Sequence, residues 1–500
     1  MEVRGKESRL DLGALALQNS GRIESLLKVA TNAADVIRKC ANEGGLIHVA
    51  SHLDADGLAA AGITGTALAR LDATFRTRIA RWLDEKTLQS ILADDPALII
   101  LSDLGSGDLE VLNSRLNGKE VLVLDHHQPV GQAAPAFVHV NPHLFEIDGS
   151  RDLSSAGISY FVAKALDGAN ADLAGVAVVG ALGDLQDKYE QRRLGGPNAL
   201  ILEDAEKAGF LKTETDLMFF GRETRPIHKA LASTTTPFIA GISGEEDKSM
   251  AFLAGLGIKP KKGEKWQALR DLSEDEKRKL FNALADYMVS RGLPGDMALN
   301  LLGSVYTLIH EEPWTSLRDA REFSVLLNAT GRMDKPSLGI ALCMGDRGAA
   351  LDEANAVLEE YRRTITKYLN WLVEPNTNRI EELANIYVVR GEGVIDDKII
   401  GTISSILSTN LMKPEKPIVA YSIVPKENLA KISARAIDLV VGRGLNLGEI
   451  LRATAEKCAG KGGGHNIAAG AQVPINELDT FIKIVDNQVK EQVGARNPES

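Results

Sequence analysis

Short apolar runs alternate with helical segments in the N-terminal part of the chain. The runs that have the length of a buried β-strand lie at 46–50, 97–101, 121–124 and 176–179. Apolar positions at helical spacing occur at 20–43, 57–70 and 157–166. Continuous apolar strands alternating with helices predict an α/β fold, in which a parallel sheet is flanked by helices on both faces.

The middle of the chain shows a different pattern, with more charge and more helix-forming residues. Ser273 and Glu276 form a capping-box pattern at the start of an amphipathic stretch at 273–291. A long helix is expected at about 350–373, and strand-like runs return at 386–390 and 418–424. The predicted domains are a parallel α/β domain, a mostly helical insertion or interaction region, a connecting helix and a second, smaller α/β domain, with bounds 1–200, 201–340, 341–375 and 376–495.

The composition is that of a globular protein. Of the 500 residues, 44% are hydrophobic and 25% charged, and the formal net charge of −11 argues against a chain coated with basic charge. A local cationic groove on an acidic body remains compatible with these numbers. The widely separated cysteines, the charged N-terminus and the lack of a long apolar run predict a soluble protein of the reducing cytoplasm, with no membrane segment.

Acidic and histidine side chains follow each of the predicted strands. These candidate site residues are His52, Asp54, Asp56, Asp103, Asp125, His126, His127 and Asp184. The carboxyl ends of parallel strands meet at one edge of a sheet, so the clusters are expected to converge there. If residues 52–56 are extended, alternate side chains point into the same cavity.

Carboxylates gathered in this way repel one another unless cations lie between them. Oxygen-rich sites with some imidazole suit Mn²⁺ or Mg²⁺ better than a zinc–thiolate centre would, and a pair of such ions can clamp a phosphate. Each cluster alone has a simpler interpretation, since a single Asp after a strand is usually a helix cap and a single His is usually packing or surface. Their joint occurrence at four predicted strand ends favours a metal site.

A glycine run near the C-terminus is a second candidate, at Lys461-Gly462-Gly463-Gly464-His465. Consecutive glycines allow backbone N–H groups to approach a phosphate. Nearby basic residues, among them Arg435, add a local cationic surface. A flexible surface loop beside a solvated charged face is the alternative.

These motifs resemble those of the DHH phosphoesterase superfamily, named for the triplet found here at Asp125-His126-His127. The other matching segments are SHLDADG at 51–57, SDLG at 102–105 and ALGD at 181–184. ISARA at 432–436 and GGGHNIAAG at 462–470 resemble the companion DHHA1 domain. The segments at 221–246 and 321–334 are similar to archaeal RecJ-like proteins of the type associated with the GINS replication complex.

The resemblance implies a role for each candidate residue. His52 and Asp54 would hold one divalent cation, and Asp56, His126 and Asp184 a second, with Asp103 bridging the two. His127 would contact the scissile phosphate or complete the metal shell, and Asp125 would orient a neighbouring imidazole. The residues expected to grip the phosphates of a strand are Ser433, Arg435, Gly463, Gly464 and His465. The cofactors implied are two divalent cations, Mn²⁺ in preference to Mg²⁺.

The leading functional prediction is a metal-dependent hydrolase, an exonuclease acting on single-stranded DNA, or alternatively RNA, in DNA replication or repair. The GINS replication complex is a partner implied by resemblance alone. A phosphodiesterase of short oligonucleotides or cyclic dinucleotides is an alternative, although the insertion at 201–340 favours the nuclease. A noncatalytic replication scaffold is a third hypothesis, against which the complete set of ligand residues argues.

Overall fold

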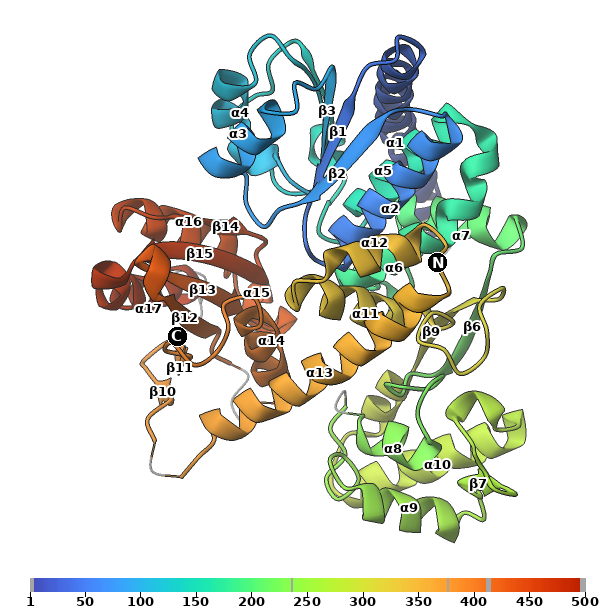
Figure 1. Ribbon diagram of the computed structural model, residues 1–500. Helices are drawn as coiled ribbons and strands as arrows, with labels where there is room; N and C mark the ends of the chain where they lie inside the picture. Colours follow the sequence, from blue (N-terminus) through green and yellow to red (C-terminus); the bar gives the residue numbers. More distant parts are fainter. Residues whose placement is uncertain (1–3, 235–236, 376, 411–414, 495–500) are drawn as a thin grey trace. The chain divides into compact units, whose positions relative to one another are not determined.

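The computed structural model describes residues 4–234, 237–375, 377–410 and 415–494 (Figure 1). The chain divides into two compact units, Met1–Asn355 and Ala356–Ser500. The division falls within helix α13 (Ala349–Leu372), which matches the long helix expected at about 350–373. The finer domain bounds at 200, 340 and 375 stay predictions.

The first unit is built on a five-stranded sheet whose neighbouring strands all run parallel, in the order β2-β1-β3-β4-β5. The strands are β1 (Ile47–Ser51), β2 (Phe75–Ile79), β3 (Leu98–Ser102), β4 (Glu120–Leu124) and β5 (Phe137–Val140). Strands β1 and β3 are buried at every position, which explains why they appear in the sequence as continuous apolar runs. The predicted α/β fold with a parallel sheet is confirmed.

Helices cover both faces of this sheet (Figure 1). The helices before and between the strands, and those that follow, are α1 (Arg4–Asn42), α2 (Ala55–Arg70), α3 (Glu85–Leu92), α4 (Leu109–Arg115), α5 (Ser155–Leu166), α6 (Ala174–Gly183) and α7 (Pro197–Lys207). Apolar side chains of α3 and α4 form one core with alternate residues of β3 and β4. Helices α1, α2 and α5 pack together on the opposite face. The central strands β1 and β3 are therefore covered on both sides, and only their ends remain available for chemistry.

The apolar run at 176–179, predicted as a fourth strand, is instead part of helix α6. A short apolar run does not by itself distinguish a buried strand from a buried helix. Helix α6 is rich in Gly, Ala and Val and packs against α2, α5 and α11, so it is apolar almost all the way round. Gly180 permits this packing, because a Cβ there would lie 2.4 Å from that of Ala156 and 2.7 Å from a carboxylate oxygen of Asp56.

The region after α7 adds a subdomain to the first unit. Its elements are β6 (Leu211–Leu217), α8 (Ile227–Ala232), α9 (Glu246–Gly255), β7 (Lys261–Lys262), β8 (Lys265–Trp266), α10 (Glu274–Ser290) and β9 (Leu302–Leu308). Strands β6 and β9, which the sequence pattern did not reveal, pair antiparallel and connect the subdomain to the rest of the unit. The capping box predicted from Ser273 and Glu276 forms at the start of α10. Helices α11 (Ala320–Arg332) and α12 (Pro336–Cys343) then return to the main body.

The second unit contains a six-stranded sheet in the order β10-β11-β12-β13-β15-β14. Its strands are β10 (Ile380–Glu382), β11 (Tyr387–Arg390), β12 (Ile418–Val424), β13 (Leu429–Arg435), β14 (Lys461–Gly464) and β15 (Ala468–Pro474), and its helices are α14 (Ile400–Asn410), α15 (Asp438–Gly442), α16 (Leu447–Lys457) and α17 (Leu478–Gly494). Strands β11 and β12 run parallel, whereas the other neighbours are antiparallel. This is the second, smaller α/β domain expected from the sequence.

The long helices α1 and α13 carry charged residues throughout their length. Within the described ranges, no helix is both long enough and apolar enough to traverse a lipid bilayer.

Candidate metal centre

The first cluster of candidate residues lies where β1 ends and α2 begins. Asp54 is the N-cap of α2, and its Oδ1 accepts a hydrogen bond from the backbone N–H of Gly57 at 3.1 Å. Asp56 lies in the first turn of the helix. The prediction of an extended segment through His52, Asp54 and Asp56 is therefore wrong, because the N-cap hydrogen bond turns the chain into a helix. A strand followed by a helical turn nevertheless brings these side chains to the end of the sheet.

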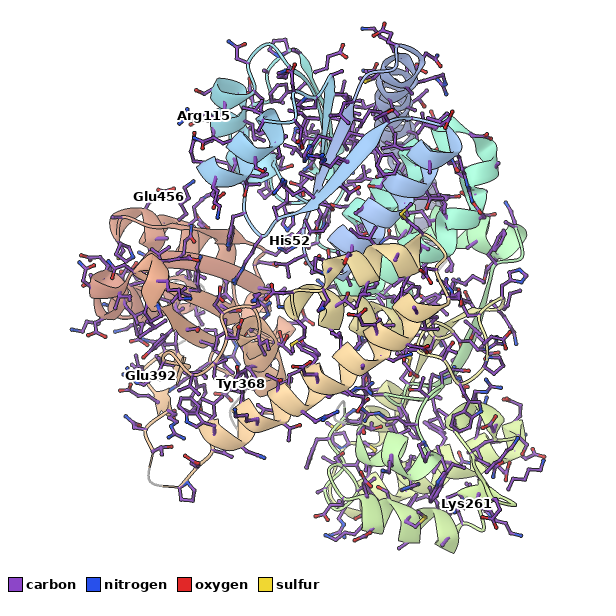
Figure 2. All side chains as sticks on the ribbon, viewed as in Figure 1. His52, Arg115, Lys261, Tyr368, Glu392 and Glu456 are labelled. Carbon is purple, nitrogen blue, oxygen red and sulfur yellow. The ribbon has the colours of Figure 1, made fainter. Side chains whose placement is uncertain are left out.

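A first group of potential ligands surrounds the imidazole of His52, at the end of the five-stranded sheet (Figure 2). Its Nδ1 lies 3.0 Å from Oδ2 of Asp54 and 3.4 Å from Oδ2 of Asp103. Asp103 directly follows β3 and has a left-handed backbone conformation with φ of 58°. Its backbone N–H donates to the carbonyl of Leu124 at 3.0 Å. The sheet thus continues to hold Asp103 beyond the last residue of its strand.

A second group contains Asp56, His126 and Asp184. Nε2 of His126 lies 3.1 Å from Oδ2 of Asp184 and 4.0 Å from Oδ2 of Asp56. The same nitrogen lies 3.4 Å from Oδ1 of Asp103, so Asp103 contacts both groups through different oxygens. Asp184 is the C-cap of α6 and reaches the site from a helix end rather than from a strand end. The clusters expected to converge are close together in this unit.

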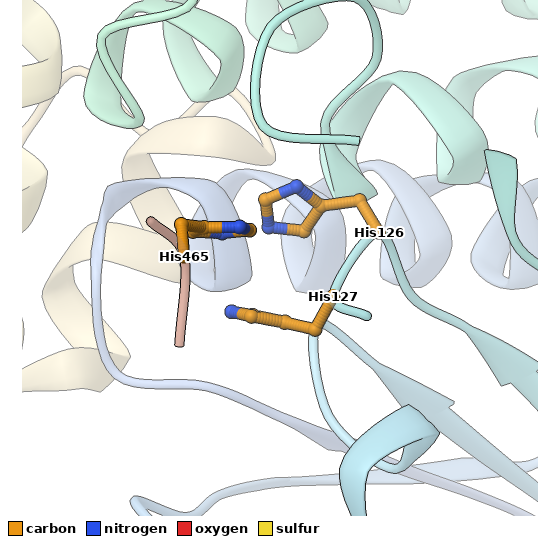
Figure 3. Close-up of side chains that lie close together, drawn as sticks. All are labelled: His126, His127 and His465. Atoms are coloured by element: carbon orange, nitrogen blue, oxygen red, sulfur yellow. The ribbon is translucent and has the colours of Figure 1, made fainter. Parts of the chain in front are cut away.

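The adjacent imidazoles of His126 and His127 are tilted against each other, with 4.4 Å between ring centroids (Figure 3). Nδ1 of His126 is 2.6 Å from the carbonyl oxygen of Gly149, to which it donates a hydrogen bond, and Nε2 is therefore directed at the carboxylates. Nδ1 of His127 lies 2.8 Å from Oδ1 of Asp125. The other oxygen of Asp125 accepts the backbone N–H of Ser106 at 2.8 Å. Asp125 thereby fixes the orientation of the His127 ring.

The site contains more carboxylates than imidazoles, so negative charge is in excess. Burial raises the pKa of Asp56, and the neighbouring carboxylates of Asp184 and Asp103 raise it further. Burial also raises the pKa of Asp184. For His126, burial acts to lower the pKa, but hydrogen bonds and charge attraction from Asp103 and Asp184 outweigh it and the pKa is raised. The carboxylates of this group repel one another, and a positive charge placed between them would relieve that repulsion.

His52 and Asp54 form a strongly charged pair beside this group. Burial opposes the charge on His52, but the carboxylates of Asp54 and Asp103 raise its pKa to about 10. The pKa of Asp54 is lowered, since the attraction of His52 exceeds the effect of burial. In the same way, His127 holds the pKa of the buried Asp125 below its usual range, and Asp125 raises that of His127.

The donor set fits divalent cations. Nδ1 of His52 and Oδ2 of Asp103 are buried atoms that make ion-pair contacts, but neither forms a well-directed hydrogen bond among the described residues. Potential ligand atoms lie within 4.8 Å of one another in a group of His52, Asp54 and Asp103 and in a group of Asp56, His126 and Asp184. Carboxylate oxygens with one imidazole in each group are the ligands that Mn²⁺ and Mg²⁺ accept.

The site also depends on residues that the sequence pattern did not single out. The backbone N–H groups of Ser155 and Ala156, at the start of α5, donate to Asp56 at 2.7 and 3.0 Å. The hydroxyl of Ser155 donates to Asp103 at 3.1 Å. These contacts hold two of the buried carboxylates in place from one helix N-terminus. The sequence signal available was Ser154 as an N-cap, which its hydrogen bond to Gly157 confirms.

The predicted strand-binding residues lie in the second unit, on the edge strand β14, in the turn after it and on the interior strand β13. Gly463 and Gly464 belong to β14, and His465 follows in the turn to β15. Ser433 pairs with Gly470, and Gly470 pairs with Gly463, so these positions form one row across three strands. Ser433 bonds to Ser404 of α14 at 3.0 Å, and Arg435, two residues on, donates from Nε to Ser405 at 2.9 Å.

The glycine run is an extended edge strand, not the flexible loop or phosphate-binding nest considered from the sequence. On one face, a Cβ at Gly462 would lie 2.6 Å from the carbonyl oxygen of Leu451 in α16. On the other face, a Cβ at Gly463 would meet nothing within 4 Å. Gly462 is thus required for helix packing, whereas Gly463 leaves the sheet backbone uncovered.

Comparisons with known proteins agree with this architecture. Models of the DHH-CID and DHHA1 domain families match residues 219–302 and 384–491. The chain is 30% identical over 478 residues to the uncharacterized protein MJ0831 of Methanocaldococcus jannaschii, an alignment that covers 94% of this chain and 99% of that protein. The chain belongs to the same family as this protein, and it carries a DHH-CID domain and a DHHA1 domain.

Two solved structures share the fold. RecJ from Thermus thermophilus, in complex with Mn²⁺, aligns with a TM-score of 0.57 at 18% identity over 94% of this chain and 55% of that protein. CDC45 from Entamoeba histolytica aligns with a TM-score of 0.63 at 12% identity over 93% of this chain and 99% of that protein. This chain therefore spans little more than half of the Thermus RecJ. At these identities the two likenesses show the fold alone.

Proposed function

We propose that this protein is a metal-dependent exonuclease that hydrolyses phosphodiester bonds of single-stranded DNA, with RNA as an alternative substrate. The observation that carries the proposal is the pair of ligand groups that share Asp103, through Oδ2 to His52 and through Oδ1 to His126. The Mn²⁺ complex of the Thermus RecJ, which has the same fold, supports this choice of metal.

We propose the ligand roles residue by residue. His52 and Asp54 would hold one cation, and Asp56, His126 and Asp184 the other, with Asp103 between them. Two divalent cations in these positions would supply Lewis acidity that polarises the phosphodiester and assists deprotonation of the attacking water. The backbone N–H groups at the start of α5 keep Asp56 in position, and Gly149 keeps Nε2 of His126 directed at the carboxylates.

His127 is proposed to contact the scissile phosphate. Burial lowers the pKa of His127, but the contact with Asp125 outweighs burial and raises it, which favours the charged imidazole. The charged ring can donate a hydrogen bond to a phosphate oxygen or to the leaving oxygen. Asp125 is the residue that orients it, through the 2.8 Å contact with Nδ1.

Strand binding is assigned to the second unit. In the row of Ser433, Gly470 and Gly463, the Ser433 hydroxyl is buried against Ser404 of α14, whereas Gly470 and Gly463 carry no side chain and allow a sugar-phosphate backbone to approach closely. Arg435 and His465 would add positive charge and hydrogen-bond donors. A role in replication or repair, and a partnership with the GINS complex, stay predictions from the resemblance.

The likeness to CDC45 favours a second candidate, a replication scaffold that does not hydrolyse nucleic acid. The two candidates differ in what they require of the metal centre. A scaffold would not need the ligand groups to bind cations, whereas the nuclease depends on them.

The test uses single strands of DNA and of RNA, labelled at either end, with purified protein and Mn²⁺. Asp103→Ala is expected to reduce hydrolysis by more than about 100-fold, because it removes the carboxylate shared by both groups. Asp172→Ala is a matched control, since Asp172 pairs with Arg70 away from the ligand groups. Activity of Asp103→Ala near that of the control would contradict the nuclease, and a wild-type protein inactive on all strands would favour the scaffold.

A further inference from the structure

Helix α11 contacts the turn that carries three of the candidate ligands. It packs against both α2 and α6, the helices that present Asp56 and Asp184. Its last turns reach the segment from His52 to Asp56, and its first turn reaches the segment after Asp184. Two residues of its C-terminal half make the contacts that matter for the first segment.

Asn328 holds the start of α2 through a single hydrogen bond. Its Oδ1 accepts the backbone N–H of Ala55 at 3.2 Å. The first N–H groups of a helix have no partner within the helix and need one from elsewhere. Ala55 is fully buried, so water does not replace the amide oxygen of Asn328 there. Ala55 lies between Asp54 and Asp56, and its backbone position therefore sets the separation of these two carboxylates.

Gly331 brings the helix backbone directly against the same turn. A Cβ at this position would overlap the carbonyl oxygen of Leu53, the residue between His52 and Asp54. The contact is with backbone rather than with the end of a flexible side chain, so the turn would have to move to accommodate a larger residue. Only glycine permits the observed approach.

The first turn of α11 holds the segment after Asp184. Arg321 donates to Oδ2 of the buried Asp187 at 2.8 Å and to the carbonyl of Ser304 at 2.7 Å. Asp184 caps the end of α6, and Asp187 lies three residues further along the chain. One rigid helix therefore contacts the segment that carries the first ligand group and the segment that carries a member of the second.

We propose that α11 is the positioning element of the metal centre, and that Asn328 and Gly331 are positioning residues that set the ligand geometry of His52, Asp54 and Asp56. The inference rests on the proposed function in that it takes these residues to bind divalent cations. Asn328 touches neither cation nor substrate and acts through the backbone of Ala55. Its loss therefore changes the affinity for metal more than the stability of the metal-free fold.

The test measures Mn²⁺ binding by isothermal titration calorimetry and thermal unfolding of the metal-free protein. Asn328→Leu, which keeps the size and removes the acceptor, is expected to weaken Mn²⁺ binding by about 10- to 100-fold, as loss of a supporting contact does at other metal sites. Asn328→Asp keeps the acceptor and is expected to restore the affinity.

Ser324→Ala is the matched control, because the Ser324 hydroxyl bonds only to Arg321 within α11. It is expected to leave Mn²⁺ affinity unchanged. Asn328→Leu with wild-type affinity, or with a loss no greater than that of Ser324→Ala, would overturn the positioning role. Gly331→Ala provides a second variant, expected to weaken Mn²⁺ binding in a protein that still unfolds cooperatively. If wild type and Asp103→Ala bind Mn²⁺ equally weakly, the proposed function itself fails.

Discussion

The two sheets of this protein present opposite kinds of surface at their candidate sites. At the end of the five-stranded sheet, buried carboxylates and imidazoles crowd together, and each is held by a specific hydrogen bond or ion pair. At the edge of the six-stranded sheet, the row through Gly470 and Gly463 has almost no side chains. The first surface is characterised by closely spaced negative charges, and the second by glycines that leave the sheet backbone without side chains.

This difference determines what each surface tolerates. In the first unit, a substitution that removes a carboxylate also removes repulsion, so the metal-free fold can survive while metal binding fails. In the second unit, adding a single methyl group changes the surface, and its effect on folding depends on which face of β14 receives it.

The largest expected effect is the response to metal. At about 100 times its Kd, Mn²⁺ is expected to stabilise the first unit by about 2.7 kcal/mol and leave the second unit unchanged. Hydrogen exchange followed by mass spectrometry measures both, with peptides from α5 reporting on the first unit and peptides from β15 on the second. Asp103→Ala should abolish the protection of α5. Equal protection of both units would contradict the assignment of the metal to the first.

Adjacent glycines of β14 provide a test of the second surface. Gly462→Ala is expected to cost about 1–3 kcal/mol in unfolding free energy, because the new methyl group meets the backbone of Leu451. Gly463→Ala, which meets open space, should change stability by less than about 0.5 kcal/mol but weaken binding of a single strand. Chemical denaturation and fluorescence anisotropy measure the two quantities. Unchanged strand affinity in Gly463→Ala would remove this face from the proposed interface.

The pH dependence of the metal-free first unit provides the last test of this comparison. The folded-state pKa of His52 is raised from 6.5 to about 10, so its stabilising contribution is complete below pH 6.5 and is lost as the pH rises toward 10. Asp54 has a lowered pKa, so its contribution is complete above its ordinary value of 3.8 and is lost on acidification. The raised pKa values of Asp56 and Asp184 add to the loss at higher pH.

Urea midpoints measured in EDTA between pH 6.5 and 9.5 should therefore fall for wild type and fall less for His52→Gln. Gly463→Ala serves as the control and should follow the wild-type profile, since it alters only the side-chain-free surface. Parallel profiles for wild type and His52→Gln would show that the charged pair does not contribute to stability.

Much of the first sheet could be predicted from the sequence, because strands buried on both faces leave continuous apolar runs such as that of β3. Helix α6 could not, since a helix buried on all sides lacks an amphipathic stripe and resembles a strand. Asp184 was nevertheless identified as a site residue, because it follows the apolar run that was predicted as a strand, and its motif also resembles that of the DHH superfamily. Strands β6 and β9 were missed because their partners lie far apart in the chain.

The sequence by itself indicated which acidic and histidine side chains lie together, and that parallel strands would deliver Asp103, Asp125 and His126 to one edge of a sheet. The tertiary structure alone decided how they are held: Asn328 on the start of α2, the α5 amides on Asp56, and the carbonyl of Gly149 on His126. The spacing of apolar residues reports only on the helix or strand in which they lie. These supporting contacts join residues 23 to 273 positions apart, and no local pattern encodes them.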